Sequence, residues 1–520
     1  MNMNWLYLIE LKSFSVFPEY FVGISILYIL LVLVLISYNV YGLIIQKSIS
    51  ECIGLTLLLS CYLILNDDLL LSIPVLGLFH ITCFYKAISM DSFGEFTKLV
   101  VCFFSSIYFF IISDFLKTHR LTALEYLIIV LFAVLGLMLL CTSNDLLTAY
   151  LAIELVSLSS YILATFKKTS SYSIEAGIKY LVTGAIASAF FLLGSSFLYA
   201  FTGSIYITDF EWILFNDSWL IVNHSAIESS VDIGLTLIIF SLFIKLALAP
   251  FHMWSLDVYE GSPTISTFFF AVITKLSFFV FLIRICYTAT IYYQDSWKFY
   301  AVIIGFFSIF VGSFGGLRQK KLKTLLAYSS VSHMGYSLLA ISSSSLVGIE
   351  MLIFYVVVYM LAGIATWFII ISLRLNNKLY PNKLNKELGD LILLRKANPA
   401  LAISFALIMF SIAGIPPLIG FLAKLGIFLS ILHVQYFIIA LFSIICSVIS
   451  TFYYIRIIKV LYFENFLTGK LYYPITTNKT ILFSLTVFCL IFFFLNPTLL
   501  YLIIHKSVWY SFSELTFSAL

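Results

Sequence analysis

Charged side chains are scarce in this 520-residue chain, since Asp, Glu, Lys and Arg make up only 10% of it. About a quarter of the residues of a soluble globular protein are charged, so the composition excludes that class. The chain is 62% hydrophobic. Its length admits about 14 spans of roughly 20–25 residues with short loops. The sequence therefore predicts an all-α polytopic membrane protein.

The usual signatures of cofactor sites are missing as well. No two of the eight cysteines fall within metal-binding spacing, which argues against a zinc or iron–sulfur site. There is no GxGxxG in a βαβ context and no GxxxxGK[ST]. We therefore expect no cofactor and no metal in this chain. The net charge is only +4, and the basic residues are spread over loops. We therefore expect no nucleic-acid partner.

The N-terminal residues, MNMNWLYLIELKSFSVFPEYF, lack the arginines of a transit peptide and a cleavage site. We expect that the protein is made in the compartment it inhabits, or that its first span is an uncleaved signal. The composition is rich in Phe, Ile, Asn and Lys, as is typical of AT-rich coding. Both features favour an organelle-encoded protein of the mitochondrial inner membrane; a bacterial plasma membrane is the alternative.

Apolar runs predict fourteen spans. They lie near 18–45, 51–66, 96–116, 121–142, 144–166, 174–201, 231–250, 264–290, 298–317, 322–343, 347–373, 397–432, 435–462 and 480–504. Residues 67–93 are ambiguous, because SIPVLGLFHITCFYK is short and mixed for a crossing. Residues 46–93 therefore admit more than one topology.

The distribution of Lys and Arg predicts the orientation. With loop 1–2 on the inside, inside loops carry 19 of the 29 basic residues, outside segments (which include Lys98) carry five, and spans carry five. The long outside loop 202–230 has acidic residues and no basic ones. This bias predicts an even number of spans with both termini outside.

The most informative stretch is 241–275, SLFIKLALAPFHMWSLDVYEGSPTISTFFFAVITK. It places Lys245 and Lys275 in two apolar helices and interrupts the first helix at Pro250. A lysine at a helix centre costs roughly 2.5–3.5 kcal/mol on insertion scales. A proline break frees backbone groups that only protein or a water-lined cavity can satisfy. The combination indicates an ion path.

The chain divides into two five-span blocks, 121–290 and 298–462, flanked by N-terminal helices in 1–120 and by a last span and tail in 463–520. Because five is odd, the blocks must run in opposite senses across the membrane. Each block interrupts its fourth helix, at LALAPFHMW and at AGIPPLIGF. Interrupted helices at matching positions of inverted repeats indicate a transport site.

The second interruption contains Gly414, Pro416 and Pro417, and Lys424 follows it. In the first block the lysine precedes the proline, so the symmetry is approximate. We expect Pro250, Gly414, Pro416 and Pro417 to shape the helix breaks and to take no part in chemistry.

Glu154 lies in the middle of a span. It is either a protonated, hydrogen-bonded carboxyl or, as we favour, a partner of Lys245, since intramembrane acids mark proton relays. Lys245, Lys275 and Lys424 lie several residues from any loop, where snorkelling to the interface is difficult. We expect these three lysines to take part in proton transfer.

His333 lies among hydroxyl side chains in AYSSVSHMGY. A lone histidine on an apolar helix is often a satisfied core residue, but imidazole suits proton transfer near neutrality, and we include it in the path. Lys179 follows Glu175 at i, i+4, as in an ordinary helix pair, and is a possible member. Arg284, at the outer end of its span, is expected to snorkel.

Five motifs carry a resemblance to a known family: LAIELVSLSSY, EAGIKYLVTGA, FIKLALAPFHMWSLDVYEGSPT, KLKTLLAYSSVSHMGY and MFSIAGIPPLIGFLAKLGIF. The chain resembles the antiporter-like membrane subunits of respiratory complex I over roughly 94–505. Within that family, the chain resembles the branch that has a lysine at the position of Lys424 and a short C-terminal tail. Residues 46–93 fit it poorly.

The resemblance implies a fold of about 14 transmembrane helices with two inverted five-helix repeats and two discontinuous helices. It implies a hydrated midplane axis in which Glu154 pairs with Lys245, Lys275 relays to Lys424, and His333 occupies a polar position. It also implies that NADH, flavin, iron–sulfur clusters and ubiquinone are bound elsewhere in the complex.

The partners implied are other membrane-arm subunits, including neighbouring antiporter-like subunits, and membrane lipids. The expected function is proton translocation coupled to NADH:ubiquinone oxidoreduction. Two alternatives stay open: a subunit of a multisubunit sodium/proton antiporter, and a scaffold whose polar axis does not conduct.

Overall fold

The structure is a computed structural model of the full chain. It describes residues 16–35, 42–71, 81–116, 119, 121, 123–210, 224–289, 293–376, 381–384, 387–392, 394–464 and 476–518. The N-terminal signal expectation, residues 211–223 of the predicted outside loop and the basic residues Lys117 and Arg120 lie outside these ranges.

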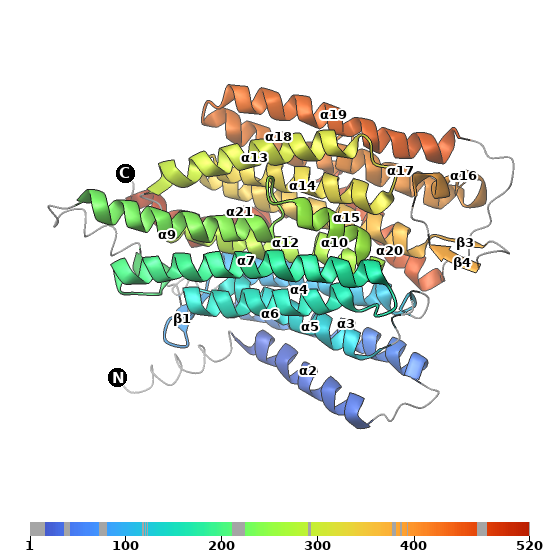
Figure 1. The fold of residues 1–520 in the computed structure, drawn as a ribbon, viewed down its shortest axis with the longest axis horizontal. Coiled ribbons are helices and arrows are strands. Elements are labelled where there is room, and N and C mark those ends of the chain that lie inside the picture. The colour runs from blue at the N-terminus through green and yellow to red at the C-terminus, as the bar shows by residue number, and fades with distance from the viewer. Residues whose placement is uncertain are drawn as a thin grey trace.

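Helices run side by side along the long axis of the molecule (Figure 1). The first half contains α2 (Phe17–Leu35), α3 (Gly42–Leu71), α4 (Ser92–Ile112), α5 (Glu125–Thr142), α6 (Leu146–Thr165), α7 (Ser171–Thr202), α9 (His224–Lys245), α10 (Met253–Gly261), α11 (Thr264–Val272), α12 (Thr274–Arg284) and the π-helix η2 (Ile285–Ala289). The second half contains α13 (Gln294–Gly316), α14 (Leu322–Ile341), α15 (Leu346–Ser372), the 3₁₀-helix η4 (Leu388–Leu391), α16 (Leu394–Ala397), α17 (Pro399–Ala413), α18 (Ile419–His433), α19 (Phe437–Tyr462), α20 (Thr477–Leu495) and α21 (Thr498–Ser518).

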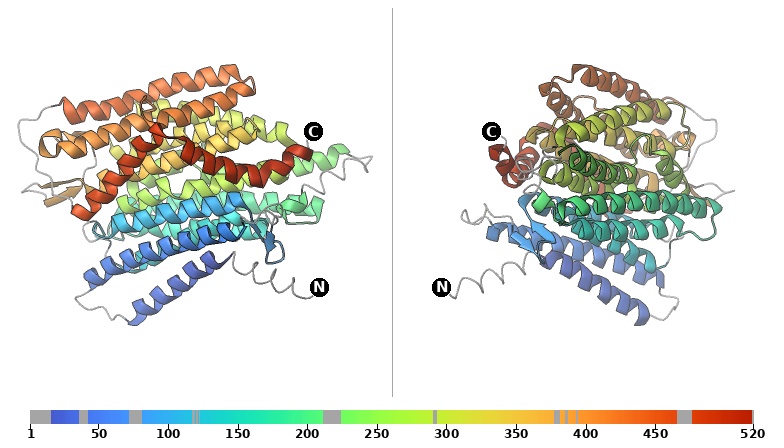
Figure 2. Two further views of the ribbon diagram at one scale, coloured as in Figure 1. Left: turned by 180° about the vertical axis from the view of Figure 1, so that it is seen from behind. Right: turned by 60° about the vertical axis from the view of Figure 1, so that its left-hand side comes forward.

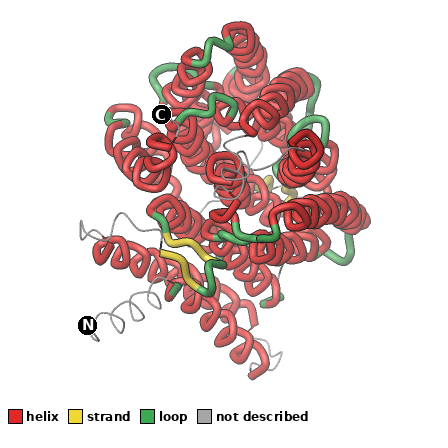
Figure 3. Tube along the Cα trace, turned by 90° about the vertical axis from the view of Figure 1, so that its left-hand side faces the viewer, coloured by secondary structure: helices red, strands yellow, loops and turns green. Residues whose placement is uncertain are grey.

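Two short antiparallel hairpins supplement the helices. One pairs β1 (Ile81–Cys83) with β2 (Ile88–Met90), and the other pairs β3 (Arg374–Asn376) with β4 (Pro381–Leu384). They lie at opposite ends of the bundle (Figure 1). Figure 3 looks along the helices, with the β1–β2 hairpin on the near side. These ends correspond to the predicted outside and inside faces, respectively.

Among the described residues, 11 helices are long and apolar enough to cross a membrane. The prediction of a polytopic helical membrane protein is therefore confirmed, whereas the count of 14 stays a prediction. Three expected spans are missing from this set: those near 231–250, 322–343 and 397–432. The last of these consists of two shorter apolar helices, Pro399–Ala413 and Ile419–His433.

Burial separates central from peripheral helices. In the most apolar 18-residue stretches of the spans 264–288 and 346–372, 94% of the residues are buried, whereas in the corresponding stretches of α2, α7 and α20 only 28% are. A helix that is apolar all round and enclosed by other helices forms the core, while one with an exposed apolar face borders lipid or another subunit. Lys275 and Lys424 lie in helices that contact the central helix α15.

Both expected discontinuities are present, between α9 and α10 and between α17 and α18. A third, at Ile273 between α11 and α12, was not predicted. It lies directly before Thr274 and Lys275. The apolar run across 264–290 is uninterrupted by Gly or Pro, so no residue in the sequence marks this break.

Three predicted boundaries need correction. The first helix ends at Leu35 and the next begins at Gly42, so the expected span 18–45 is too long and the second span includes more of 46–93 than predicted. The expected last span, 480–504, is interrupted at Asn496–Pro497, because proline has no N–H for a continuing helix. The helices α20 and α21 form a bent pair across the back of the bundle (Figure 2), and α21 continues into the expected tail.

Candidate functional site

Lys245 is the last residue of α9, at the first helix break. After it the chain turns through Ala247, which has φ 58°, and a cis Ala249–Pro250 bond. The indole Nε1 of Trp254 donates a 2.9 Å hydrogen bond to the carbonyl of Ile244. This bond satisfies a carbonyl at the end of the helix. The ammonium therefore lies at the negative end of the helix dipole, where a cation is stabilised.

Glu154 lies on α6 and is half-buried. Its Oε2 accepts a 3.1 Å hydrogen bond from Ser157. Two turns further along the same helix, the Tyr161 hydroxyl accepts a 3.3 Å hydrogen bond from Lys245 Nζ. The Glu154 and Lys245 charges interact electrostatically, but the ion pairs of the described residues include none between them. Tyr161 is thus the direct partner of Lys245.

Lys275 is buried on α12, two residues after the Ile273 interruption. Its ammonium lies 5.3 Å from the centre of the Tyr359 ring on α15. A cation over an aromatic face is attracted by the ring quadrupole, most strongly where water is excluded. The side chain therefore has an electrostatic partner without a carboxylate.

His333 bonds through both ring nitrogens. Its Nδ1 lies 2.5 Å from the Tyr355 hydroxyl and its Nε2 lies 3.1 Å from the Tyr454 hydroxyl. The imidazole interacts electrostatically with both Lys275 and Lys424. One histidine thus lies within the fields of the two buried lysines.

Lys424 is buried on α18 and donates a 2.7 Å hydrogen bond to the backbone carbonyl of Ala413, at the end of α17. The second helix break therefore supplies an acceptor to a lysine. Gly414, which follows with φ 83°, leaves the space that the lysine occupies: a Cβ at this position would lie 2.8 Å from Lys424 Cδ. The cis Pro416–Pro417 bond lies within the same break.

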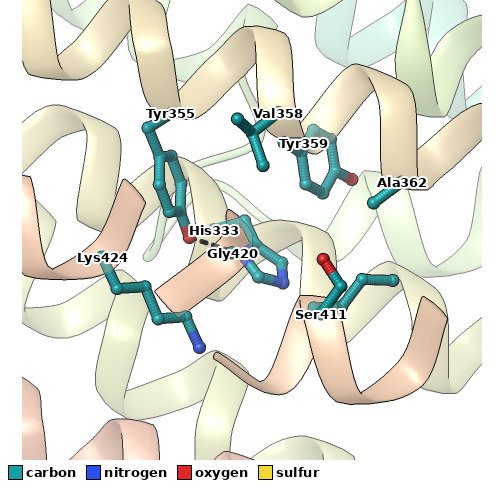
Figure 4. Close-up of a pocket in the computed structure, with 9 residues that line it drawn as sticks. His333, Tyr355, Val358, Tyr359, Ala362, Ser411, Gly420 and Lys424 are labelled. Carbon is teal, nitrogen blue, oxygen red and sulfur yellow. Dashed lines mark hydrogen bonds between the residues drawn. The ribbon is translucent and has the colours of Figure 1, made fainter. Parts of the chain in front are cut away.

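A small cavity of about 20 Å³ joins His333 and Lys424 (Figure 4). Its lining also includes two tyrosines and several apolar or small residues: Tyr355, Val358, Tyr359, Ala362, Ser411, Ile412 and Gly420. A polar cavity of at least roughly 10–15 Å³ can hold a water molecule. The space is thus large enough for one water between the imidazole and the ammonium.

Tyrosines lie between the site of Glu154 and Lys245 and the site of Lys275, His333 and Lys424. The sequence did not point to these tyrosines. The rings of Tyr161 and Tyr180 lie 4.9 Å apart, edge to face. Tyr259 interacts electrostatically with Tyr180 and with Tyr359, the residue beneath Lys275. With 33 tyrosines in the chain, residue type alone could not identify these. The short helix α10, which carries Tyr259, brings it beside them.

Lys179 is exposed, unlike the buried lysines Lys275 and Lys424. Its side chain is 44% exposed and forms ion pairs with Glu175 at 2.8 Å and with Asp257 at 2.7 Å. The predicted i, i+4 pair is present, and Asp257 adds a partner from α10. Pro250, Pro416 and Pro417 lie at the breaks as expected.

Two expectations about basic residues were wrong. Arg284 does not snorkel: its guanidinium is buried, pairs with Asp91 at 2.6 Å, and donates to Ser89 and to the carbonyl of Cys141. Lys98, assigned to an outside segment, is fully buried in α4. In both cases an acidic partner made burial possible. Glu95, three residues before Lys98, was an available sequence signal, whereas Asp91 is distant from Arg284 in the sequence.

Comparisons with known proteins identify the family of this chain. The model of the family described as NADH:quinone oxidoreductase/Mrp antiporter, TM, matches residues 143–450. NADH-ubiquinone oxidoreductase chain 2 of Marchantia polymorpha is 36% identical over 424 residues, 81% of this chain and 84% of that protein. NADH-quinone oxidoreductase subunit N of Pelagibacter ubique is 33% identical over 452 residues, 86% of this chain and 89% of that protein.

A chain of respiratory complex I from Thermus thermophilus has the same fold, with a TM-score of 0.73 at 24% identity over 93% of this chain and 98% of that chain. The matched residues 143–450 of the family model include both interrupted helices and the segments that carry Lys245, Lys275 and Lys424. The chain belongs to the NADH:quinone oxidoreductase/Mrp antiporter membrane family, among its NADH-ubiquinone oxidoreductase chain 2 and NADH-quinone oxidoreductase subunit N members.

Proposed function

We propose that this chain translocates protons as a membrane subunit of a proton-pumping NADH:quinone oxidoreductase. The observation that carries the proposal is the position of His333, which interacts with Lys275 and Lys424 and shares a cavity with the latter. Together with Glu154, Lys245 and the tyrosines, these side chains form one row of ionisable and hydroxyl groups. Intramembrane ionisable residues of this kind mark proton relays.

In this proposal the row works by electrostatic displacement. A change in the charge of the Glu154–Lys245 site alters the proton affinity of Lys275, and His333 passes the effect to Lys424. Moving one charge against 100 mV requires about 2.3 kcal/mol. This energy has to come from a redox reaction elsewhere in the complex, with NADH, flavin, iron–sulfur clusters and ubiquinone bound by other subunits.

The membrane and the partners follow from the same proposal. Relatives occur in both mitochondria-bearing plants and bacteria, and the composition favours the mitochondrial inner membrane. The half-exposed α6 and the exposed α7 would face lipid or neighbouring antiporter-like subunits of the membrane arm. Lys179 would then lie at the edge of the path.

The test is proton pumping by the assembled complex in vesicles, followed with a pH-sensitive dye during NADH oxidation. Glu154→Gln and Lys245→Ala should each lower pumping and coupled quinone reduction while the complex still assembles. Glu464→Gln is the matched control, because Glu464 is exposed beyond α19. Normal pumping by the assembled Glu154 and Lys245 variants would contradict the proposal.

Two other outcomes would assign a different function. The family description also names Mrp antiporters, and sodium-dependent transport without NADH-linked partners would favour that activity. Retained pumping after Lys245, Lys275 and Lys424 are neutralised together would favour a scaffold with a non-conducting axis.

A further inference from the structure

Two peripheral helices, α13 and α19, present large apolar side chains on the outside of the bundle. The helix α19 lies at the upper edge of the molecule in Figure 1 and packs along α13. The two helices meet at the stacked rings of Phe306 and Phe442, whose centres lie 4.0 Å apart. Six side chains next to this contact are between 40% and 64% exposed: Phe310 and Phe314 on α13, and Ile445, Val448, Phe452 and Ile455 on α19. We refer to these six residues as the α13–α19 face.

Three basic side chains lie at one end of the α13–α19 face. Arg318 comes four residues after the last aromatic residue of this face on α13, and Lys459 comes four residues after its last aliphatic residue on α19. Both are exposed. Arg456, which is half-buried, joins the two helices, because its Nη1 donates a 3.3 Å hydrogen bond to the carbonyl of Leu317. The apolar face therefore ends in three positive charges.

These three cations have no carboxylate partner within the part of the chain that the structure describes. None of its ion pairs includes Arg318, Arg456 or Lys459. The neighbouring 3₁₀-helix η4 packs against α19 and carries Glu387 and Asp390, whose carboxylates bond to the backbone of η4 in a capping box. Like charges that lie close together repel one another, so an anion from outside the chain would stabilise the three cations.

The apolar face and its cationic end together match one phospholipid in size. At about 1.5 Å per residue, the stretch 445–455 of α19 rises about 15 Å, which is half of the roughly 30 Å hydrocarbon thickness of a bilayer. The acyl chains of one leaflet can therefore cover the α13–α19 face while the headgroup lies beside the cations.

The arginines suit a phosphate group. A guanidinium can bind phosphate through two parallel N–H donors. The bond to the Leu317 carbonyl holds Nη1 of Arg456 in place, and among the described residues it is the hydrogen bond that this side chain makes. The remaining donors of Arg456 are thus held at the membrane boundary beside Arg318.

The cations lie at the predicted inside face. The loop that follows α13 bonds to the segment that follows the β3–β4 hairpin, since the N–H of Leu388 donates a 3.0 Å hydrogen bond to the carbonyl of Lys320. Basic sites between membrane helices on this side bind anionic headgroups. A zwitterionic headgroup fits less well, because it brings an ammonium of its own to three cations.

We propose that the α13–α19 face, together with Arg318, Arg456 and Lys459, binds an anionic phospholipid. Its phosphate lies at the three cations and its acyl chains lie along the two helices. The site goes beyond the proposed function, because lipid binding does not require proton transfer along the central row. Loss of lipid binding and loss of pumping are therefore separate results.

The experiment is photolabelling of the assembled complex in phosphatidylcholine vesicles that contain a small fraction of phosphatidylglycerol with a photoreactive acyl chain. Peptides of α13 and α19 should be labelled. Unlabelled phosphatidylglycerol should compete for this labelling, whereas additional phosphatidylcholine and inorganic phosphate should not.

Arg318→Gln and Lys459→Gln should each lower the labelling about fivefold, as expected for the loss of one positive charge near an anionic headgroup. The matched control is Lys168→Gln, because Lys168 is an exposed lysine of the same predicted face in the loop between α6 and α7. This control should leave the labelling of α13 and α19 unchanged. Arg318→Lys keeps the charge and should retain the labelling, which covers the case in which Arg318→Gln fails to assemble.

Three results would overturn the inference. The first is equal labelling by a photoreactive phosphatidylcholine, or labelling that is unchanged in both glutamine variants. The second is competition by inorganic phosphate, since the site would then bind a free anion. The third is a crosslink from α13 and α19 to a neighbouring subunit without any lipid label, since protein would then cover this face.

Discussion

The ammonium of Lys424 and the backbone carbonyl of Ala413 lie 2.7 Å apart, joined by a hydrogen bond across the second helix break. Interrupting α17 exposes a carbonyl that lipid cannot satisfy, and the lysine satisfies it. The break and the lysine thus depend on each other. Lys424 follows Ala413 by eleven positions in the sequence. In a continuous helix the Ala413 carbonyl would accept an intrahelical hydrogen bond instead of one from the lysine.

Gly414→Ala should therefore damage both the break and the lysine. A non-glycine residue at φ 83° costs about 1–2 kcal/mol in backbone strain, and the new Cβ would displace the Lys424 side chain. We expect a lower thermal unfolding midpoint of the assembled complex together with reduced proton pumping.

Two further glycines separate these effects. Gly203→Ala introduces strain at φ 70° with no atom within 4 Å of the new Cβ, and Gly389→Ala introduces neither strain nor contact. The Gly203 variant should lose stability but pump normally per assembled complex, and the Gly389 variant should match wild type. Normal pumping by the Gly414 variant would show that Lys424 tolerates displacement.

His333→Phe should remove the imidazole partner of the buried Tyr355 hydroxyl and one of the two partners of the Tyr454 hydroxyl, which still accepts a 3.5 Å hydrogen bond from Tyr453. Each unsatisfied buried group costs about 1–3 kcal/mol. Removal of a positioned proton-transfer group lowers the rate of proton transfer, on the order of a hundredfold or more when that step is limiting. Pumping per assembled complex, measured with a pH-sensitive dye, should fall well below wild type.

Tyr454→Phe is the comparison for this variant. It removes the bonds of the Tyr454 hydroxyl to His333 and Tyr453 but leaves the imidazole in place, so the loss of pumping should be smaller than for His333→Phe. Equal losses in stability with unchanged pumping in both variants would assign His333 a packing role alone.

Arg284→Met should be strongly destabilising, because it leaves Asp91 buried without its cation. Breaking a buried ion pair by removing one partner costs about 3–5 kcal/mol. The double variant with Asp91→Asn should recover much of that loss. The measurement is the thermal unfolding midpoint of the assembled complex.

The exposed pair between Lys321 and Glu260 is the matched control for Arg284. Exposed ion pairs contribute about 0–1 kcal/mol, so Lys321→Ala should shift the midpoint little. An Arg284→Met variant as stable as Lys321→Ala would mean that buried Asp91 does not need the guanidinium as its partner.

Asp114, just beyond the end of α4, makes stability depend on pH. Burial by itself would raise the pKa of Asp114, but the hydrogen bond and charge of Lys47 at 2.8 Å and the charge of Lys479 at 3.9 Å hold this pKa below its usual value. A carboxyl whose pKa is lower when folded stabilises the protein above its unfolded pKa and loses that contribution as the pH falls through the folded pKa.

The wild type should therefore be more stable than Asp114→Asn at neutral pH, and the difference should shrink as the pH is lowered below about 4, near the unfolded pKa of an aspartate. Thermal midpoints of both proteins across a pH series provide the measurement. A difference that is constant with pH would indicate that the charge of Asp114 does not contribute.

The sequence by itself determined most of the helical assignment and the identity of the central groups. Apolar runs of span length leave few alternatives to membrane helices, because backbone groups in lipid must be satisfied within the chain. Lysines within such runs are exceptional enough to indicate function. Glu154, Lys245, Lys275, His333 and Lys424 could all be named in this way, as could the two proline-marked breaks.

Only the tertiary structure decided which of these groups are neighbours. Packing of α10 against α7 and α14 brings Tyr259 toward Tyr180 and Tyr359, and docking of α2 beside α4 gives Lys98 the distant partner Glu19. Neither contact has a sequence signal, because residues 79 or more positions apart in the sequence meet through helix packing. Periodicity specifies which face of a helix is apolar, whereas the partner of a buried charge is set by the helix that packs against it.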